Sequence, residues 1–570
     1  MSLAACGGGS GTGSAGDNPT FKEGGNAGAG KDATATGPVA IPSNAQKGGT
    51  MTVMSYVAPS TFDPTQAYYV DSTAILSDLV TRSLTQYVYN PKTGDMVLEP
   101  DMATDLGRPN ASNTSWTFTL KKGLKYEDGS PVEPADVAYA IKRSFAIKEL
   151  PYGPTYQTTF FLDGDKYKGP FKDGDNYKGV VVNGQNITIK MRRPFTDMDY
   201  YGSFPAFTAI PEKKDDPATY GKHPMATGPY KFADYKPGSE LKLVKNDYWD
   251  PKSDPGRIQA VDGWDFKFAQ NTSKLENIII NDNGDAQTTL SYDNVTPAGY
   301  KQIQSDKSRL VTGSQPCTFM WFIDMKKITN IDVRKAIGWA YPYQNAWKAG
   351  GYIEGLTRVP GTSILPPGTA GRVNYDALGN KGYKTDPAKS RALLKKAGYK
   401  PGEFAIKFLY ATDDDKSVAA KDEIVKGLTA GGFKAVPLAT TEANIRTDRA
   451  DYNNPENVRS SGWCSDWPDG GSWFPAQWAG SLVGQDGMPN PANFKEGDMD
   501  AMQNHILDKL SPQQALGAWG QFDKKMETKY YPAVNTGYGG VAMIRGSRVG
   551  GMVDDNVRGM PTFGRMYITK

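Results

Sequence analysis

The stretch Gly462-Trp463-Cys464-Ser465-Asp466-Trp467-Pro468-Asp469 organises the interpretation of this chain, and it is followed by Trp473, Phe474, Gln477 and Trp478. Tryptophan rings supply large apolar contact areas at little conformational cost. A carboxylate among such rings lies where water is scarce, and a buried charge without a partner is costly. We therefore expect Asp466 to need a cation, and the ammonium group of a ligand is one candidate.

A simpler interpretation of the same segment stays open at this point. In it, the segment is a loop of the hydrophobic core, and Asp466 caps a helix or pairs with a nearby arginine. A single short motif does not decide between the two interpretations. The rest of the chain has to do so.

Composition narrows the possible functions. The 570 residues suffice for more than one domain, and 65 Lys and Arg against 62 Asp and Glu leave a net charge of +3, which gives no electrostatic attraction for nucleic acid. Only two histidines occur, His223 and His505, which argues against a histidine metal site or a catalytic triad. We expect neither a cofactor nor a metal. The 31 Tyr and 11 Trp favour an aromatic binding surface.

The first residues predict a lipid anchor. Leu3-Ala4-Ala5-Cys6 precedes a glycine run and resembles the bacterial lipobox, in which the cysteine receives a diacylglyceryl group. No apolar run is long enough to span a membrane, and the charged and apolar parts of a signal peptide are missing. Residues 1–47 are rich in small and polar residues, a composition typical of flexible tethers. We expect lipid on Cys6 to hold a globular body at the outer face of the cytoplasmic membrane.

Hydrophobic periodicity predicts alternating strands and helices in the body. Strands are expected at 51–57, 115–120 and 317–325, helices at 72–84 and 133–147, and a hairpin at 180–189 around Asn183-Gly184. Two similar acidic segments, 163–169 and 173–179, lack the glycine and the glutamate of a calcium-binding EF-hand loop, so we interpret them as tandem turns. The mixture predicts an α/β fold.

Several motifs occur in an order known from one protein family. They are Phe62-Asp63-Pro64, the run 116–129, Pro134-Ala135-Asp136-Val137, Ala226-Thr227-Gly228-Pro229-Tyr230, Asn246-Asp247-Tyr248-Trp249, Asp332-Val333-Arg334-Lys335-Ala336-Ile337 and the segment 386–399. Together they resemble the family 5 extracellular solute-binding proteins, which are the peptide, oligopeptide and nickel receptors of ABC importers. The resemblance extends from about residue 48 to the C-terminus.

The resemblance implies a two-lobed periplasmic-binding-protein fold with an extra inserted domain. The implied boundaries are 48–75, 215–316 and 534–570 for lobe one, 76–214 for the inserted domain, and 317–533 for lobe two. It also implies a receptor and not an enzyme, which captures its ligand between closing lobes and delivers it to a membrane permease. We expect this receptor to be a monomer.

The resemblance also assigns roles to residues of the opening segment. In the oligopeptide-binding branch, a Gly-Trp-Cys-Ala-Asp-Tyr element holds the α-ammonium group of the peptide, and this role carries over to Asp466. The same branch implies a disulfide between Cys317 and Cys464, which would contribute about 2–5 kcal/mol. The backbone of an extended peptide would pair with a strand edge.

Further candidates surround this point. The walls of the site are expected to come from Tyr56, Val57 and Ala58 at the end of the first strand, and from Trp463, Trp467 and Trp473. Some relatives hold the carboxyl end of the peptide with an arginine three residues before the tryptophan of the element. Ser460 occupies that position here, and Arg459 is the candidate replacement, although a structural or surface role for it stays open.

Two alternatives to short peptides remain. A different solute, such as an oligosaccharide, a metal chelate or haem, would use the same lobes, and the tryptophans suit the stacking of sugar rings. A glycosidase would need paired carboxylates such as Asp466 and Asp469. Acidic residues beside Pro and Gly are more often turn formers, however, and Asp466 next to Cys464 favours peptides.

Overall fold

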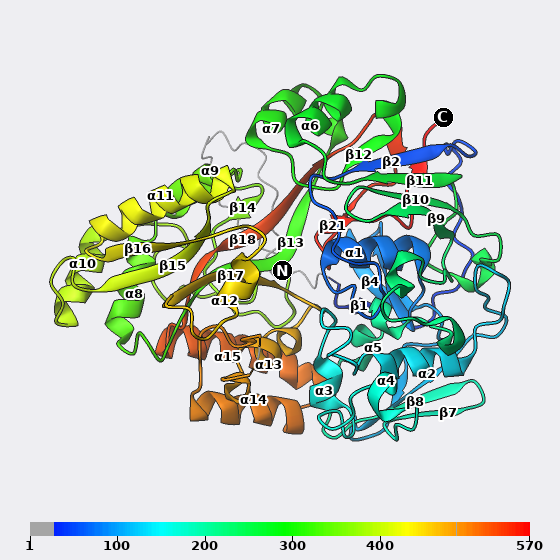
Figure 1. The fold of residues 1–570 in the computed structure, drawn as a ribbon, viewed down its shortest axis with the longest axis horizontal. Helices are drawn as coiled ribbons and strands as arrows, with labels where there is room; N and C mark the ends of the chain where they lie inside the picture. Colours follow the sequence, from blue (N-terminus) through cyan, green and yellow to red (C-terminus); the bar gives the residue numbers. More distant parts are fainter. Residues whose placement is uncertain (1–27, 486) are drawn as a thin grey trace, which may run out of the picture.

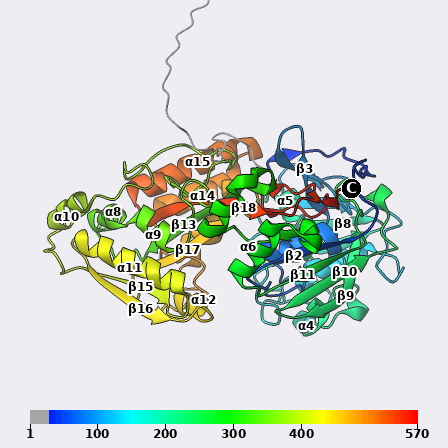
Figure 2. The ribbon, with the colours of Figure 1, turned by 90° about the horizontal axis from the view of Figure 1, so that it is seen from above.

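The computed structural model describes residues 28–485 and 487–570, and it confirms the predicted α/β fold class. Figure 1 shows two halves joined by two long antiparallel strands, β13 (Leu310–Ile323) and β18 (Ala533–Ile544). Figure 2 shows the same two strands between the halves from a second direction. Cys6 and its lipobox lie outside the described residues.

The first half, lobe one, is built on a five-stranded sheet in the order β12-β2-β11-β10-β9. Its strands are β2 (Thr50–Met54), β9 (Tyr230–Lys236), β10 (Glu240–Lys245), β11 (Gly263–Lys267) and β12 (Thr289–Ser291), with α6 (Thr272–Asn281) and α7 (Pro297–Ile303) packed beside them. β2 ends earlier than predicted because Asp293 Oδ2 accepts hydrogen bonds from Tyr56 N (2.8 Å) and Ser55 Oγ (2.9 Å). The side chain of Asp293 thus replaces a neighbouring strand.

The second half, lobe two, is built on a four-stranded antiparallel sheet in the order β14-β18-β13-β17. β14 (Arg358–Val359) and β17 (Val458–Cys464) are its edges. One face carries α8 (Ile331–Ala340), α9 (Tyr343–Ala349), α10 (Pro387–Lys396), β15 (Ala405–Ala411), α11 (Asp415–Ala430) and β16 (Lys434–Thr440). The other face carries α13 (Phe474–Gln477), α14 (Gly497–Lys509) and α15 (Pro512–Lys529).

β13 and β18 belong to both halves. Residues 310–314 pair with 540–544, the register then shifts, and pairing resumes between Thr318 and Tyr538. Leu290 of lobe one forms a β-bridge with Arg545, directly after β18. The predicted strand 317–325 is therefore one end of a longer strand that crosses between the lobes.

A third sheet, in the order β5-β6-β8-β7, belongs to the part predicted as the inserted domain. Its strands are β5 (Arg108–Pro109), β6 (Ser115–Thr119), β7 (Val180–Asn183) and β8 (Asn186–Lys190), and the nearby helices are α2 (Pro134–Arg143), α3 (Tyr156–Phe160), α4 (Pro170–Asp173) and α5 (Met198–Tyr201). Asn183 pairs with Asn186, so the hairpin turn consists of Gly184 and Gln185 and not of Asn183-Gly184. The domain boundaries themselves stay a prediction.

The predicted helix 72–84 is shorter in the structure. It comprises α1 (Val70–Ile75) and a π-helical turn, Leu76–Val80. Beyond it, Arg82 N donates to Thr227 Oγ1 (2.9 Å), and Arg82 Nε donates to Asp101 Oδ1 (2.6 Å). These buried tertiary contacts compete with helical hydrogen bonds, which local periodicity cannot show.

The expected tether is corrected for the residues that the structure describes. β1 (Gly30–Lys31) pairs in parallel with β4 (Asp95–Pro100), which also pairs with β3 (Thr85–Asn90). Lys31 Nζ lies 2.5 Å from Asp199 Oδ2, and Ala45 forms a bridge with Thr569. Backbone pairing and an ion pair hold this segment without apolar bulk, so composition alone failed to predict its attachment.

The chain ends in short strands that pack on lobe one. They are β19 (Val549–Gly550), β20 (Asp554–Asp555), β21 (Met560–Pro561) and β22 (Tyr567–Ile568). None of the helices in the described part of the chain combines the length and the apolar character needed to span a membrane.

Candidate functional site

β17 ends in a disulfide at the boundary between the lobes. Cys464 lies opposite Cys317 in the register of β17 and β13, and their sulfur atoms are 2.02 Å apart. The next residue, Ser465, donates its backbone N–H to Pro316 O (2.8 Å). The disulfide and the ladder together fix the start of the loop that carries Asp466.

The carboxylate of Asp466 is held by two tyrosines from the opposite side of the boundary. Tyr68, just before α1, donates its hydroxyl to Asp466 Oδ2 (2.6 Å), and Tyr156, the first residue of α3, donates to the same oxygen (2.5 Å). The segment before α1, the start of α3 and the loop after β17 therefore meet at this side chain. Oδ1 makes no hydrogen bond with any of the residues that the structure describes.

Among the residues that the structure describes, Asp466 has no cationic partner, because no Lys or Arg nitrogen lies within 4 Å of its carboxylate. Burial raises the pKa of Asp466 to about 7, while the hydrogen bonds from Tyr156 and Tyr68 act in the opposite direction. The site thus holds an acid that loses its proton near neutral pH. A cation beside the carboxylate would stabilise its charged form. A primary ammonium group has the charge and the donors that Oδ1 lacks.

The tryptophans of the segment divide into two groups. Trp467 is fully buried, with its ring 4.6 Å from the Tyr156 ring and its Nε1 donating to Asp197 Oδ2 (3.2 Å). Trp473 and Trp478 are buried in the core of lobe two. Trp463 is only partly buried, and its Nε1 donates to Ser472 O (3.1 Å). Of the predicted walls, Trp463 keeps exposed surface, whereas Trp467 and Trp473 serve packing.

Arg459 lies in the interior of lobe two. Its Nη1 donates to Asp324 Oδ2 (2.9 Å), and its Nε lies 3.4 Å from Glu456 Oε1. The side chain is fully buried. The structure therefore gives Arg459 a structural ion pair and does not present it to a ligand.

Tyr56 and Val57 are on the facing edge of lobe one. Tyr56 is 43% exposed and Val57 is 51% exposed, which is unusual for large apolar side chains that follow a buried strand. Lys416, near the start of α11 in lobe two, has its ammonium nitrogen 5.9 Å from the centre of the Tyr56 ring. These residues flank the boundary between the lobes, as expected for walls of a site there.

One edge of β17 is available to a further strand. Arg449, the last residue of α12 (Ile445–Arg449), donates Nη1 to Ser460 O (2.8 Å), so this carbonyl points away from β13. Backbone groups in a strand alternate between its two edges. The N–H and C=O groups of Gly462 and Cys464 therefore face the same open edge as Ser460 O.

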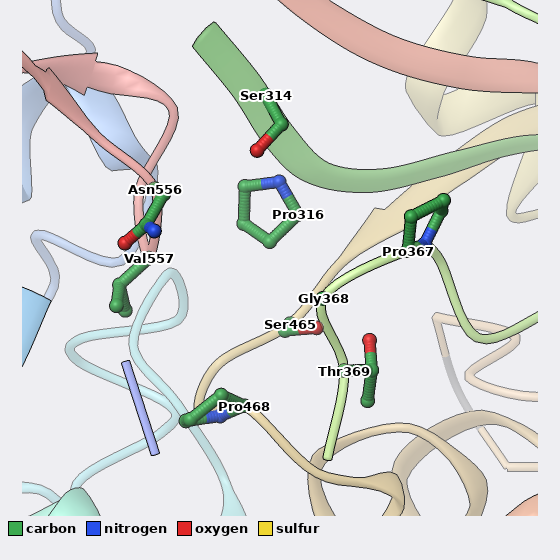
Figure 3. A pocket seen from close by; sticks show the side chains of 9 residues that line it. All are labelled: Ser314, Pro316, Pro367, Gly368, Thr369, Ser465, Pro468, Asn556 and Val557. Carbon is green, nitrogen blue, oxygen red and sulfur yellow. The ribbon is translucent and has the colours of Figure 1, made fainter. Parts of the chain in front are cut away.

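Beside this segment the two lobes are in close contact. Figure 3 shows a small cavity lined by residues of β13, of the loop 367–369, of the loop after β17, and by Asn556 and Val557. Its volume is about 10 Å³, the room of one water molecule. A ligand larger than water does not fit into this cavity.

Comparison with known families identifies the family of this chain. The model of the bacterial extracellular solute-binding proteins, family 5 Middle, matches residues 97–484. The chain belongs to family 5 of the bacterial extracellular solute-binding proteins. The prediction made from its motifs is therefore confirmed.

Individual relatives of this family 5 protein are distant. The probable D,D-dipeptide-binding periplasmic protein DdpA of Escherichia coli is 22% identical over 453 residues, 75% of each chain. Heme-binding protein A of Haemophilus influenzae is 22% identical over 465 residues, 76% of this chain and 79% of its own. The structure of clavulanic acid biosynthesis oligopeptide binding protein 2 superposes with a TM-score of 0.83 at 23% identity, covering 95% of this chain and 99% of that one. This structural likeness shows the shared fold.

Three residues of the site in this family 5 protein had no signal in the sequence. Tyr68 and Tyr156 are 398 and 310 residues from Asp466 along the chain, and Arg449 precedes β17 in a short helix. Only the cysteine pair offered a clue, because it indicated which segments lie next to Asp466. Among the described residues, no group of three or more His, Cys, Asp or Glu is placed to hold a metal ion.

Proposed function

We propose that this family 5 protein is the extracellular receptor of an ABC importer and binds short peptides in extended form between its lobes. The observation that carries the proposal is Asp466, a largely enclosed carboxylate with neutral hydrogen-bond donors and no cation among the described residues. A permanently paired acid would need no ligand. An acid that burial pushes toward neutrality is stabilised in its charged form when an ammonium group arrives.

The strand edge beside Asp466 supports an extended peptide as the source of that ammonium group. Gly462 and Cys464 direct their backbone N–H and C=O groups toward the open edge of β17. A peptide that pairs there satisfies its own backbone groups whatever its side chains are, as in other cases of strand addition. Its amino end then reaches Asp466, and Trp463, Tyr56 and Val57 border its side chains.

The remaining parts of the proposal follow from the family. Family 5 proteins are solute-binding proteins, so the partner would be a membrane permease, and binding without turnover is the expected activity. Lipid on Cys6 would anchor the receptor, as a monomer, outside the cytoplasmic membrane. A glycosidase that uses Asp466 and Asp469 is disfavoured because Asp469 Oδ1 accepts Gly471 N (2.7 Å) and caps the turn Gly470–Ser472.

Calorimetry with an Asp466→Asn variant tests this function. Alanine peptides of two to six residues serve as ligands, each with a free and with an acetylated amino end. We expect Asp466→Asn to lower the affinity of the free peptide by about 2–5 kcal/mol, since a buried ammonium group is left without its counter-ion. Acetylation should cost the wild type a similar amount and the variant little more.

The matched control is Asp422→Asn, which changes an exposed carboxylate of α11 that pairs with Lys421. It should bind peptides as the wild type does. Equal affinities of wild type and Asp466→Asn for all free peptides would refute the proposal. Binding of cello- or chito-oligosaccharides or haem in place of peptides would move the function to another solute.

A further inference from the structure

Residues 28–32, which we call the N-terminal strap, lie beside the loop that carries Asp466. β1 pairs in parallel with β4 (Figure 1), and the last residue of the strap donates its backbone N–H to Leu98 O (2.9 Å). At its other end, Gly28 is buried with a φ of +71°, and a side-chain carbon on it would lie 2.2 Å from Val557 Cγ2 and 3.6 Å from Pro468 Cγ. Pro468 follows Asp466 by two residues, so the N-terminal strap reaches from β4 to the loop 465–469.

Lys31 of the strap directs its charge toward a group of acids. Its Nζ lies 2.5 Å from Asp199 Oδ2 and 4.1 Å from the centre of the Tyr200 ring. Two residues before Asp199, Asp197 accepts a hydrogen bond from Trp467 Nε1 at its Oδ2 (3.2 Å). The N-terminal strap therefore supplies a cation to the surface on which the loop 465–469 rests.

Asp197 and Asp469 face each other across this contact. Asp197 precedes α5, and Asp469 belongs to the loop after β17. A side-chain carbon on Gly471 would lie 2.6 Å from Asp197 Oδ2 and 2.9 Å from Asp469 Oδ1, so both carboxylates point to the same place above this glycine. Two ionised carboxylates repel each other, and the repulsion is stronger where water is scarce.

The charge of Lys31 acts on both members of this pair. Burial raises the pKa of Asp469 well above its usual range, the charge of Asp197 adds to this rise, and Lys31 opposes it. Burial and the charge of Asp199 raise the pKa of Asp197, and Lys31 again opposes the rise, as it does for Asp199 itself. Tyr200 also faces these acids and stays neutral, because burial and their charges raise its pKa. Lys31 thus favours the ionised pair in the closely packed arrangement.

We propose that Lys31 is a positioning residue of the ligand site: its charge keeps the loop 465–469 on the surface that Asp197 forms, and so keeps Asp466 at its two tyrosines. For ligand affinity the inference rests on the peptide-binding function proposed above, whereas for the position of the loop it stands without that function. Because coupling between two sites is reciprocal, a ligand that holds the loop also holds the N-terminal strap.

Hydrogen exchange of the ligand-free protein at pH 8 tests the position of the loop. Gly471 N donates to Asp469 Oδ1 (2.7 Å), so its exchange reports whether the loop is held. In Lys31→Gln, we expect residues 465–472 to exchange about 5–20-fold faster than in the wild type. Lys31→Arg keeps the charge and should restore exchange to nearly the rate of the wild type.

Two further variants complete the comparison. Gly28→Ala keeps Lys31 but displaces the strap, since the new side chain meets Val557 and the backbone has a positive φ, and it should give an intermediate increase. Lys245→Gln is the matched control, because Lys245 is 35% exposed, against 37% for Lys31, and pairs with Asp262 at 2.8 Å. It should leave the exchange of residues 465–472 unchanged.

The dependence on pH separates this role from that of an ordinary structural ion pair. Once the three acids are protonated, their repulsion is absent and Lys31 is no longer needed. Because their pKa values are raised, this state is reached at a higher pH than for exposed acids. The ratio of the exchange rates of Lys31→Gln and the wild type should therefore be largest at pH 8 and approach one toward pH 5.

Calorimetry and exchange with a ligand test the coupling. The alanine peptide that binds the wild type most tightly should bind Lys31→Gln about 5–20-fold more weakly at pH 8, and Lys245→Gln unchanged. In the wild type, this peptide should slow the exchange of residues 28–32. It should not affect residues 43–49, which are held by the C-terminal strand through Gln46 N and Ile568 O (2.7 Å).

Unchanged exchange of residues 465–472 in ligand-free Lys31→Gln overturns the inference, and so does an equal increase at pH 5 and pH 8. Faster exchange of the loop with an unchanged affinity for the peptide overturns it as well, because the loop would then not position the site. If no peptide binds the wild type, the proposed function fails, and the exchange of the ligand-free proteins still decides whether Lys31 holds the loop.

Discussion

Arg459 and Asp466 are charged residues only seven positions apart on β17 and its loop, but their surroundings differ. Arg459 is fully buried and pairs with Asp324 and Glu456. Asp466 is enclosed by two tyrosine hydroxyls and has no cation among the described residues. The charge of Arg459 is compensated by carboxylates of the protein itself. The charge of Asp466 has no such partner among the described residues, and Asp466 lies where three parts of the chain meet.

This difference separates a structural charge from the charge that we propose binds the ligand. Charged groups that are buried and mutually paired contribute to the native state only as long as all partners are present. A buried charge held by neutral donors costs stability in the free protein, and that cost is recovered when a ligand supplies the opposite charge. The contrast explains why Arg459, although close in sequence to Asp466, is a poor candidate for ligand contact.

Removal of the structural charge should have the largest effect. Arg459→Met leaves Glu456 without the arginine it pairs with and Asp324 with only the more distant Lys327 (3.9 Å), so the free energy of unfolding should fall by about 3–5 kcal/mol. Urea denaturation at pH 7.5 measures it. The control Arg391→Met, at the surface of α10, should change stability by less than about 0.5 kcal/mol. A loss as small as in the control would mean that Arg459 is not the structural charge described above.

Removal of the charge of Asp466 should change the free energy of unfolding in the opposite direction. The pKa of Asp466 in the folded protein is raised to about 7, above its ordinary value near 4. The folded state therefore binds the proton more tightly than the unfolded state, and the stability cost of the charge is absent below about pH 4, grows up to about pH 7 and is complete above it.

Asp466→Asn should accordingly be more stable than the wild type at pH 8, by roughly 1–3 kcal/mol, and equal to it near pH 4. Urea denaturation of both proteins across this range measures the difference, which removes the contributions of all other acids. A variant that is less stable than the wild type at pH 8 would show that Asp466 is a structural charge after all.

The tyrosine contacts should produce the smallest effect. Tyr68→Phe removes a hydrogen bond that lowers the pKa of Asp466, so this pKa should rise further. Peptide affinity at pH 7 should fall by about 0.5–1.5 kcal/mol, and its dependence on pH should shift to higher pH. Calorimetry between pH 6 and pH 8.5 measures both, with Tyr152→Phe, a 61% exposed tyrosine, as the control. An unchanged pH profile would mean that Tyr68 does not act on the carboxylate.

Local sequence patterns predicted the fold better than the site. β6, β8 and α2 lie within the segments predicted for them, because their buried residues recur at the spacing of one face, whereas β2 begins as predicted but ends early. Helix ends were less predictable, since side chains distant in sequence, such as Asp101 and Thr227 with Arg82, decide them.

The site depends on contacts that no local pattern encodes. The resemblance to relatives singled out Asp466 and Cys464. The hydroxyl groups that bind Asp466, however, come from two other parts of the chain. Sequence proximity favoured Arg459 as the second cation near β17. In the structure, however, its side chain turns into the core, and Arg449 reaches the strand from a separate helix. Such an exchange requires the three-dimensional path of the chain.

The position of β18 also constrains how the molecule is made. This strand lies between β13 and β14, all twelve of its residues are buried, and it is built from residues 533–544. A ribosome releases the chain from its N-terminus, so the sheet of lobe two lacks an interior strand until residues 533–544 have been synthesised and can join the earlier strand β13.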